Sequence, residues 1–111
     1  VSVFLVDEEG QLLPRSLFKG NNENLIQGQT RLHKLPLDED YDLIAVATRD
    51  DQSIQLCVLN KNGRLLDAGK IKTEFPIYYG LAGQKIGDQL FLFAGSVGGK
   101  KLVSYRLDAT L

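Results

Sequence analysis

Residues 1–13 read VSVFLVDEEGQLL, and residues 54–66 read IQLCVLNKNGRLL. In each stretch a mostly apolar run is followed by a polar segment that ends in glycine and then by a pair of leucines. Successive side chains of a strand point to opposite faces, and a short polar segment containing glycine is typical of a hairpin turn. The two stretches therefore predict two β-hairpins of the same design.

The similarity continues beyond the hairpins. Gly10 aligns with Gly63 at an offset of 53 residues, and LIAVA at 43–47 is similar to LFLFA at 90–94 at an offset of 47. A period of about 50 residues built only from strands is typical of propeller blades and related arrays. Residues 1–111 are thus predicted to form a single all-β unit with approximate repeats at 1–20, 21–72 and 73–111.

The rest of the chain fits an all-β fold. No segment carries the three-and-four spacing of apolar residues that a helix needs, and β-branched and aromatic residues dominate the apolar runs. Short loops between consecutive strands favour antiparallel pairing, so we expect an antiparallel meander of about nine strands. The predicted strands are 1–7, 11–18, 29–35, 42–48, 53–60, 64–72, 76–82, 88–95 and 100–107.

Composition limits the class of partner. The chain has 111 residues, of which 43% are hydrophobic and 24% charged, so it reads as globular rather than disordered. Thirteen basic and fourteen acidic residues give a net charge of −1, which argues against nucleic acid as a partner. The apolar runs are far shorter than the ~20 residues of a membrane span. A single cysteine excludes an intrachain disulfide.

Two longer segments resemble the blades of β-propellers, in particular lactonase-like, quinoprotein-like and WD-type blades. They are DLIAVATRDDQSIQLCVLNKNGRLLDAGKI at 42–71 and QLFLFAGSVGGKKLVSYRLD at 89–108. In that family a hairpin of the form D/N-x-x-G-x-L recurs in each blade. A closed propeller needs at least four blades of ~40–50 residues, whereas this chain holds about two and a half. The resemblance therefore implies a further polypeptide that completes the array of sheets.

An alternative resemblance leads to a sandwich. VSVFLVDEEGQ at 1–11, followed by TRLHKLPLDEDYDLIAVAT at 30–48, is similar to transthyretin-like and carboxypeptidase-regulatory modules. That resemblance implies a β-sandwich of seven to nine strands, complete in itself and used as an exported adhesin or surface module. A small β-barrel is the third fold left open.

Two residues are candidates for catalysis. His33 is the only histidine and could act as a general base, but no serine or acid stands at a recognisable spacing from it. We interpret it as a solvent-facing histidine on a strand. Cys57 lies within an apolar run and aligns with Phe4, so we expect both in equivalent core positions. No catalytic residue is predicted.

The acidic and aromatic clusters are the candidates for binding. Asp38, Asp40 and Asp42 alternate in LDEDYDL, a spacing that can converge on Ca²⁺, but a solvated acidic turn is the favoured reading. We predict no metal site and no cofactor. Tyr78 and Tyr79 follow Pro76 and must face opposite sides of a strand, so one of them is expected to be a contact residue.

A glycine-rich segment precedes the last third of the chain. GLAGQKIG at 80–87 is interpreted as a flexible segment, and the absence of a following helix excludes a dinucleotide or phosphate loop.

These observations favour a non-catalytic module that binds a protein or ligand by presenting strand edges and loops. Its expected partner is a protein, or a further chain that completes the sheet array. Two alternatives remain open: an exported β-sandwich surface module, and a fragment of a propeller hydrolase.

Overall fold

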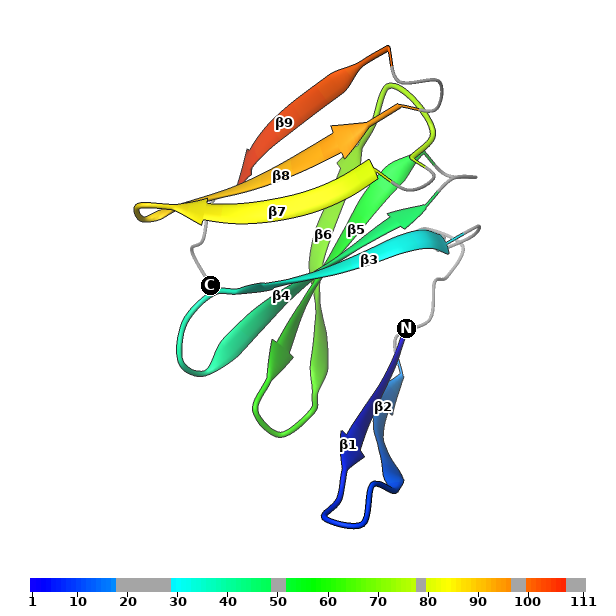
Figure 1. The fold of residues 1–111 in the computed structure, drawn as a ribbon, viewed down its shortest axis with the longest axis vertical. Helices are drawn as coiled ribbons and strands as arrows, with labels where there is room; N and C mark the ends of the chain where they lie inside the picture. Colours follow the sequence, from blue (N-terminus) through cyan, green and yellow to red (C-terminus); the bar gives the residue numbers. More distant parts are fainter. Residues whose placement is uncertain (18–28, 49–51, 78–79, 97–99, 108–111) are drawn as a thin grey trace.

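A computed structural model describes residues 1–17, 29–48, 52–77, 80–96 and 100–107. Within these ranges the chain forms nine strands, all paired antiparallel, in three sheets and without helices (Figure 1). The predicted all-β class is therefore confirmed. No helix in this part of the chain has the length and apolar character needed to cross a membrane.

The three sheets have two, four and three strands. Their orders are β1-β2, β3-β4-β5-β6 and β7-β8-β9, so each sheet is a simple meander. The strands are β1 (Ser2–Val6), β2 (Leu12–Leu17), β3 (Gln29–Pro36), β4 (Tyr41–Thr48), β5 (Ser53–Asn60), β6 (Leu65–Lys72), β7 (Gly80–Ile86), β8 (Gln89–Gly95) and β9 (Leu102–Leu107).

One predicted strand is misplaced. We expected the seventh strand at 76–82, whereas β7 spans Gly80–Ile86. Pro76 has no N–H to donate to a ladder, and the Thr73 hydroxyl donates to the carbonyl of Phe75 at 2.8 Å, which fixes a non-strand conformation. This segment instead inserts Phe75 and Ile77 into the core.

The glycines at 80–87, predicted to be flexible, lie largely within β7. Gly80 pairs with Gly95 of β8, and a Cβ at Gly80 would lie 3.1 Å from the Gly95 nitrogen. A Cβ at Gly83 would lie 3.0 Å from the imidazole of His33 on β3. Glycine at these positions therefore permits close approach of neighbouring strands.

The β1–β2 and β5–β6 hairpins have the same register at an offset of 53 residues. Both contain a β-bulge, at Arg15 in β2 and at Ala68 in β6, and these two residues are also separated by 53 positions. The corresponding pairs are Ser2↔Leu17 and Gln55↔Lys70, Val3↔Ser16 and Leu56↔Gly69, Phe4↔Pro14 and Cys57↔Asp67, Leu5↔Leu13 and Val58↔Leu66, and Val6↔Leu12 and Leu59↔Leu65.

The turn of the β1–β2 hairpin is closed by Asp7. Its Oδ1 accepts hydrogen bonds from the N–H groups of Glu9 and Gln11 at 2.9 and 2.8 Å. Its carbonyl accepts from the N–H of Gly10, which takes the positive φ of 83° that we expected of this residue. A short polar side chain at the first turn position thus satisfies the backbone of the whole turn.

The turn of the β5–β6 hairpin repeats these contacts with Asn60 in place of Asp7. Asn60 Oδ1 accepts from the N–H groups of Asn62 and Arg64 at 2.9 and 3.0 Å, and its carbonyl accepts from the N–H of Gly63. Gly63 has a φ of 81°. The two turns therefore share their hydrogen bonds as well as their length.

The four-stranded and three-stranded sheets pack face to face. β3 and β7 lie side by side, and the β3–β4 and β7–β8 turns are at the same side of the molecule, so β3 and β7 run in the same direction (Figure 1). Lys85, near the end of β7, donates to the carbonyl of Leu37, just after β3, at 3.4 Å. The core between the sheets contains Ala45, Ala47, Ile54, Phe75, Ile77, Leu81, Leu92 and Ala94.

The opposite face of the four-stranded sheet is also apolar. Ile44, Val46 and Cys57 form a buried cluster there, and Val1 packs against it. Arg15 of β2 lies against Gly63, since a Cβ at that glycine would be 3.0 Å from the Arg15 side chain. The β1–β2 hairpin therefore contacts the four-stranded sheet through Val1 and Arg15, on the opposite side from β7–β9.

Candidate functional site

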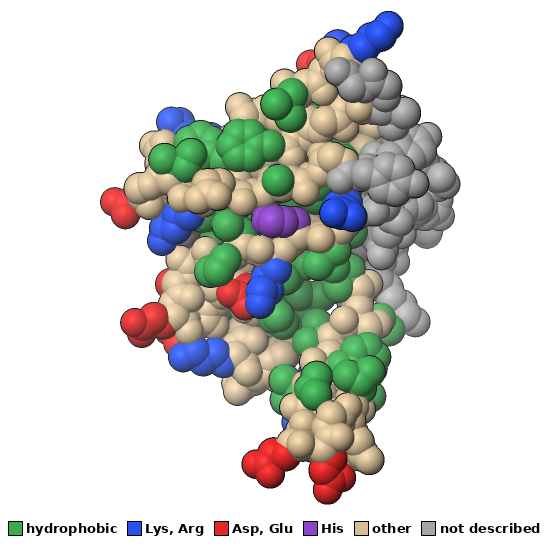
Figure 2. Space-filling view, in the orientation of Figure 1, with side chains coloured by type: hydrophobic (Ala, Val, Ile, Leu, Met, Phe, Trp, Pro, Cys, Tyr) green, Lys and Arg blue, Asp and Glu red, His purple; other side chains and the backbone are tan. Residues whose placement is uncertain are grey.

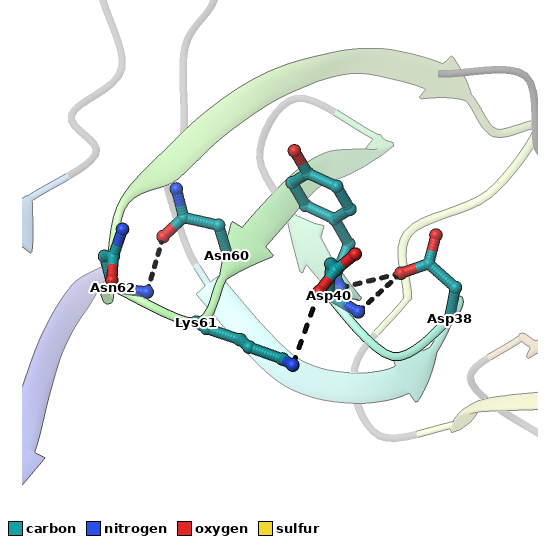
Figure 3. Close-up of polar contacts among 6 residues, drawn as sticks. Asp38, Asp40, Asn60, Lys61 and Asn62 are labelled. Atoms are coloured by element: carbon teal, nitrogen blue, oxygen red, sulfur yellow. Dashed lines mark hydrogen bonds and ion pairs between the residues drawn. The ribbon is translucent and has the colours of Figure 1, made fainter.

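The acidic turn between β3 and β4 is held by one of its own carboxylates. Asp38 Oδ1 accepts hydrogen bonds from the N–H groups of Asp40 and Tyr41 at 2.8 and 2.9 Å (Figure 3). Asp42, by contrast, lies within β4 and pairs with Pro36 and Leu59. The Asp38 carboxylate thus has a structural role in the turn.

Asp40 reaches the neighbouring turn between β5 and β6. Lys61 Nζ lies 3.3 Å from Asp40 Oδ1, and both side chains are mostly exposed (Figure 3). Exposed ion pairs of this kind contribute about 0–1 kcal/mol. A surface hollow of about 300 Å³ lies beside the pair and is lined by Asp40, Tyr41, Asn60, Lys61 and Asn62.

The three aspartates do not form a common site. Asp38 is engaged with backbone amides and Asp40 with Lys61, while Asp42 belongs to the strand. Among the described residues, no three His, Cys, Asp or Glu side chains are arranged to hold a metal ion. Of the other binding candidates, Tyr78 and Tyr79 lie outside the described residues.

His33 is half-buried at the surface between β3 and β7. It pairs with Ala45 in the β3–β4 ladder, and its ring lies over Gly83 of β7. The expectation of a solvent-facing histidine is met in part: the imidazole is visible on the surface in Figure 2, while the missing side chain at position 83 makes room for its other side. The exposed neighbour is Leu32, which points to the opposite face of β3.

Cys57 is fully buried, as predicted. Burial, together with the Asp67 carboxylate across the β5–β6 ladder, raises the pKa of its thiol to about 11. A nucleophilic cysteine needs a lowered pKa and access to solvent, and Cys57 has neither.

The prediction that Phe4 occupies the same kind of core position is wrong. Phe4 is 47% exposed, whereas Cys57, at the matching hairpin position, is 0% exposed. The strand faces are the same, but Cys57 lies in a buried cluster with Ile44 and Val46 against which Val1 packs, and no described residue buries Phe4 in the same way.

Phe4 belongs to a surface that sequence reasoning missed. Phe4, Val6, Leu12 and Leu17 share one face of the β1–β2 hairpin, and these side chains are between 47% and 66% exposed. We call this surface, together with Pro14, the hairpin face. Alternation along both strands is the signal for it, since pairs such as Phe4↔Pro14 and Val6↔Leu12 are apolar on both strands.

The hairpin face is hollowed near the bulge. A recess of about 480 Å³ is lined by Ser2, Val3, Phe4, Pro14, Arg15 and Leu17. In the matching position of the β5–β6 hairpin, the longer Gln55 replaces Ser2. Gln55 is fully buried and its amide nitrogen bridges the bulge to Asp67 Oδ1 and the Gly69 carbonyl. The smaller Ser2 side chain leaves the corresponding space open.

A second apolar surface lies at the other end of the stack of sheets. Phe91 and Phe93 project from β8 away from the four-stranded sheet, with ring centroids 6.4 Å apart. Leu102, which pairs with Gly95, lies on the same side of β9 and is 76% exposed. We call these three residues, with Ile86, the outer face of β7–β9. Figure 2 shows apolar side chains gathered over the β1–β2 hairpin and over β7–β8.

Comparison of the chain with known protein families, curated proteins and solved structures finds no match.

Proposed function

We propose that this chain is a non-catalytic protein-interaction module, part of a larger propeller-type array of stacked sheets, and that it binds a protein partner through the hairpin face. The observation that carries the proposal is the contrast between two hairpins of identical register. In the β5–β6 hairpin Cys57 is fully buried in a cluster against which Val1 packs, whereas the β1–β2 hairpin leaves Phe4 exposed. Exposed apolar patches on one face typically mark an interaction site.

The hairpin match supports a repeating unit. If β1–β2 is equivalent to β5–β6, then it corresponds to the last two strands of a four-stranded unit such as β3–β6. The sheet β7–β9 then corresponds to the first three strands of the next unit. The two-stranded and three-stranded sheets then each match part of the four-stranded unit.

The stacking of the sheets supports the same interpretation. β3 and β7, the first strands of successive sheets, are neighbours and run in the same direction, as expected if successive sheets of an array are related by translation with some rotation (Figure 1). A two-sheet sandwich accounts for β3 to β9 but leaves the β1–β2 hairpin, a separate two-stranded sheet, outside it. The propeller resemblance is therefore favoured over the sandwich.

Stacking by translation also changes the alignment of the strands. At the offset of 47, Ala45 would be equivalent to Leu92, but these residues point toward each other across one core. Equivalent residues must point the same way along the stack, and a shift of one residue reverses the face. The offset of 48 satisfies this condition in both strands, since the pair Ile44↔Cys57 then matches Leu92↔Tyr105.

With these offsets Phe4, Cys57 and Tyr105 become equivalent positions in three successive units. Cys57 packs in the cluster that Val1 covers, and Tyr105 packs against the core shared with the four-stranded sheet. Two of the three positions thus face a preceding layer, and the third, Phe4, faces the proposed partner.

Photo-crosslinking tests this proposal. Benzoylphenylalanine in place of Phe4, in cells that make the native protein, should crosslink to a protein segment outside the β1–β2 hairpin. Leu12→Glu on the same face should abolish this crosslink, because a buried unpaired carboxylate opposes docking. Benzoylphenylalanine at Leu32, which is 53% exposed but lies elsewhere, is the matched control. No crosslink from position 4, or one that Leu12→Glu leaves unchanged, would contradict the proposal.

A further inference from the structure

We infer that the partner at the hairpin face is a second copy of this chain, docked through its outer face of β7–β9. This inference rests on the proposed function and names the partner for that surface. It requires that one molecule carry both halves of an interface, at opposite ends of its stack of sheets.

The contact inside the chain defines the two halves. One side is contributed by β4 residues that point toward β7–β9, such as Leu43 and Ala45. The other side is contributed by β8 and β9 residues that point back, such as Leu92 and Tyr105. Each sheet therefore presents one face to the layer before it and the other face to the layer after it.

The hairpin face and the outer face of β7–β9 correspond to the two sides of this contact. Neither is covered by another sheet among the described residues. At the offset of 48, Phe91 and Phe93 are equivalent to Leu43 and Ala45, which cover the next layer. At the offsets of 53 and 48, Phe4 is equivalent to Cys57, which lies in the cluster that Val1 packs against, and to Tyr105, which packs toward the four-stranded sheet. The outer face of β7–β9 is thus equivalent to the face of β4 that packs against β8 and β9, and we expect it to pack against the hairpin face in the same way.

The two surfaces are also chemically suited to each other. The hairpin face is apolar apart from Ser2 and carries a recess at the bulge, while the outer face projects the stacked rings of Phe91 and Phe93. An aromatic side chain that fills such a recess is the usual anchor of a protein interface. Figure 2 shows apolar side chains over the β1–β2 hairpin and over β7–β8, at opposite ends of the long axis of the molecule.

This arrangement is heterologous, because different surfaces of the two copies meet. Heterologous contacts close into rings when the rotation per copy permits and otherwise extend into open chains. The mass of the assembly is therefore expected to grow with concentration beyond that of one chain. An isologous dimer, formed by two hairpin faces, would stop at two copies.

Complementary variants test the inference with the purified 111-residue chain. Light scattering should show wild-type assemblies heavier than the 12.3 kDa chain. Phe4→Glu and Phe93→Glu should each be monomeric, with the dissociation constant raised about tenfold or more. When the two variants are mixed, one intact hairpin face meets one intact outer face, so a complex of one copy of each should form. Leu32→Glu is the control for an exposed leucine outside both surfaces and should assemble like wild type.

The outcomes separate this inference from the proposed function. A wild-type chain that stays monomeric overturns the second copy as partner, while the crosslink from position 4 in cells still tests the hairpin face. Failure of the mixed variants to form a complex overturns the head-to-tail arrangement. Leu102→Glu, at a highly exposed position of the outer face, replaces Phe93→Glu if the latter disturbs folding as judged by circular dichroism.

Discussion

Phe4 and Cys57 show how much a residue's position alone determines. Both lie in strands of matching register, and their side chains point to the same face of their hairpins. The strand fixes the direction of a side chain, but only an adjacent layer removes it from water. The same alternation therefore describes a fully buried thiol in one hairpin and a half-exposed phenyl ring in the other.

The buried thiol gives a prediction for alkaline stability. Burial, with the Asp67 carboxylate, raises the pKa of Cys57 from its ordinary value of 9.0 to about 11. The folded state therefore holds the proton more tightly than the unfolded chain. The free energy of unfolding should be independent of this group below pH 9 and should fall as the pH rises from 9 through 11.

Urea unfolding at pH 7, 9 and 10.5 measures this effect. Cys57→Val lacks the thiol and supplies the background from the tyrosines and lysines. The wild type should lose more stability than the variant above pH 9, and equal losses would contradict the raised pKa. In the native state at pH 8 an aromatic disulfide reagent should react with Cys57 far more slowly than in urea.

At the scale of elements, the two hairpin turns depend on a single polar side chain each. Asp7 and Asn60 each accept two backbone hydrogen bonds through Oδ1. The hairpins differ in their surroundings, because β5–β6 belongs to the four-stranded sheet while β1–β2 pairs only with itself. Replacing this side chain with alanine should therefore affect stability differently in the two turns.

Asn60→Ala should lower the free energy of unfolding by about 1 kcal/mol, the usual value for lost hydrogen bonds of this kind. Asn60→Asp keeps the acceptor and should cost much less. Asp7→Ala should leave global unfolding nearly unchanged but speed amide exchange within β1 and β2, because that hairpin opens locally. Denaturant unfolding and hydrogen exchange check these outcomes. An equal loss of global stability for Asp7→Ala and Asn60→Ala would contradict this difference in coupling.

The sequence predicted most strands because alternation and turn glycines are local signals. Gly10 and Gly63 marked their turns correctly, and the observed strands match the predicted ones to within two residues apart from β7. The error at β7 arose because Gly80 and Gly83 weaken a strand signal when read alone. Their reason is non-local: one glycine faces Gly95 and the other lies beneath the ring of His33. The bulges at Arg15 and Ala68 likewise left no signal that we recognised.

At the scale of the whole molecule, the sequence could indicate repeated segments but not which faces meet. The alignment of 43–47 with 90–94 by residue type gave an offset of 47, which places the aligned residues on facing sides of one core. Both faces of β4 and β8 carry apolar residues. A comparison of residue types therefore cannot distinguish the offset of 47 from the offset of 48. The hairpin face could not be found from the sequence for a related reason, since the sequence does not show which apolar strand face is covered by other residues.

The shared core provides a test of how the layers depend on one another. Ile77 comes from the connection between β6 and β7, is fully buried, and packs in the cluster that joins β4 and β5 to β7 and β8. Ile77→Ala removes buried methyl groups from a site bounded by both sheets, which typically costs about 2–5 kcal/mol. Leu12→Ala, on the exposed hairpin face, should change stability by only about 0.5 kcal/mol.

Denaturant unfolding combined with hydrogen exchange distinguishes a shared core from separate ones. If the four-stranded and three-stranded sheets unfold as one unit, Ile77→Ala should lower protection in β4, β5 and β8 by the same free energy. Loss of protection in β8 alone would mean that the four-stranded sheet is stable without β7–β9. In that case the sheets would unfold separately, and each would depend on a neighbouring sheet to bury its apolar face. This is expected for an array whose units contact only their neighbours.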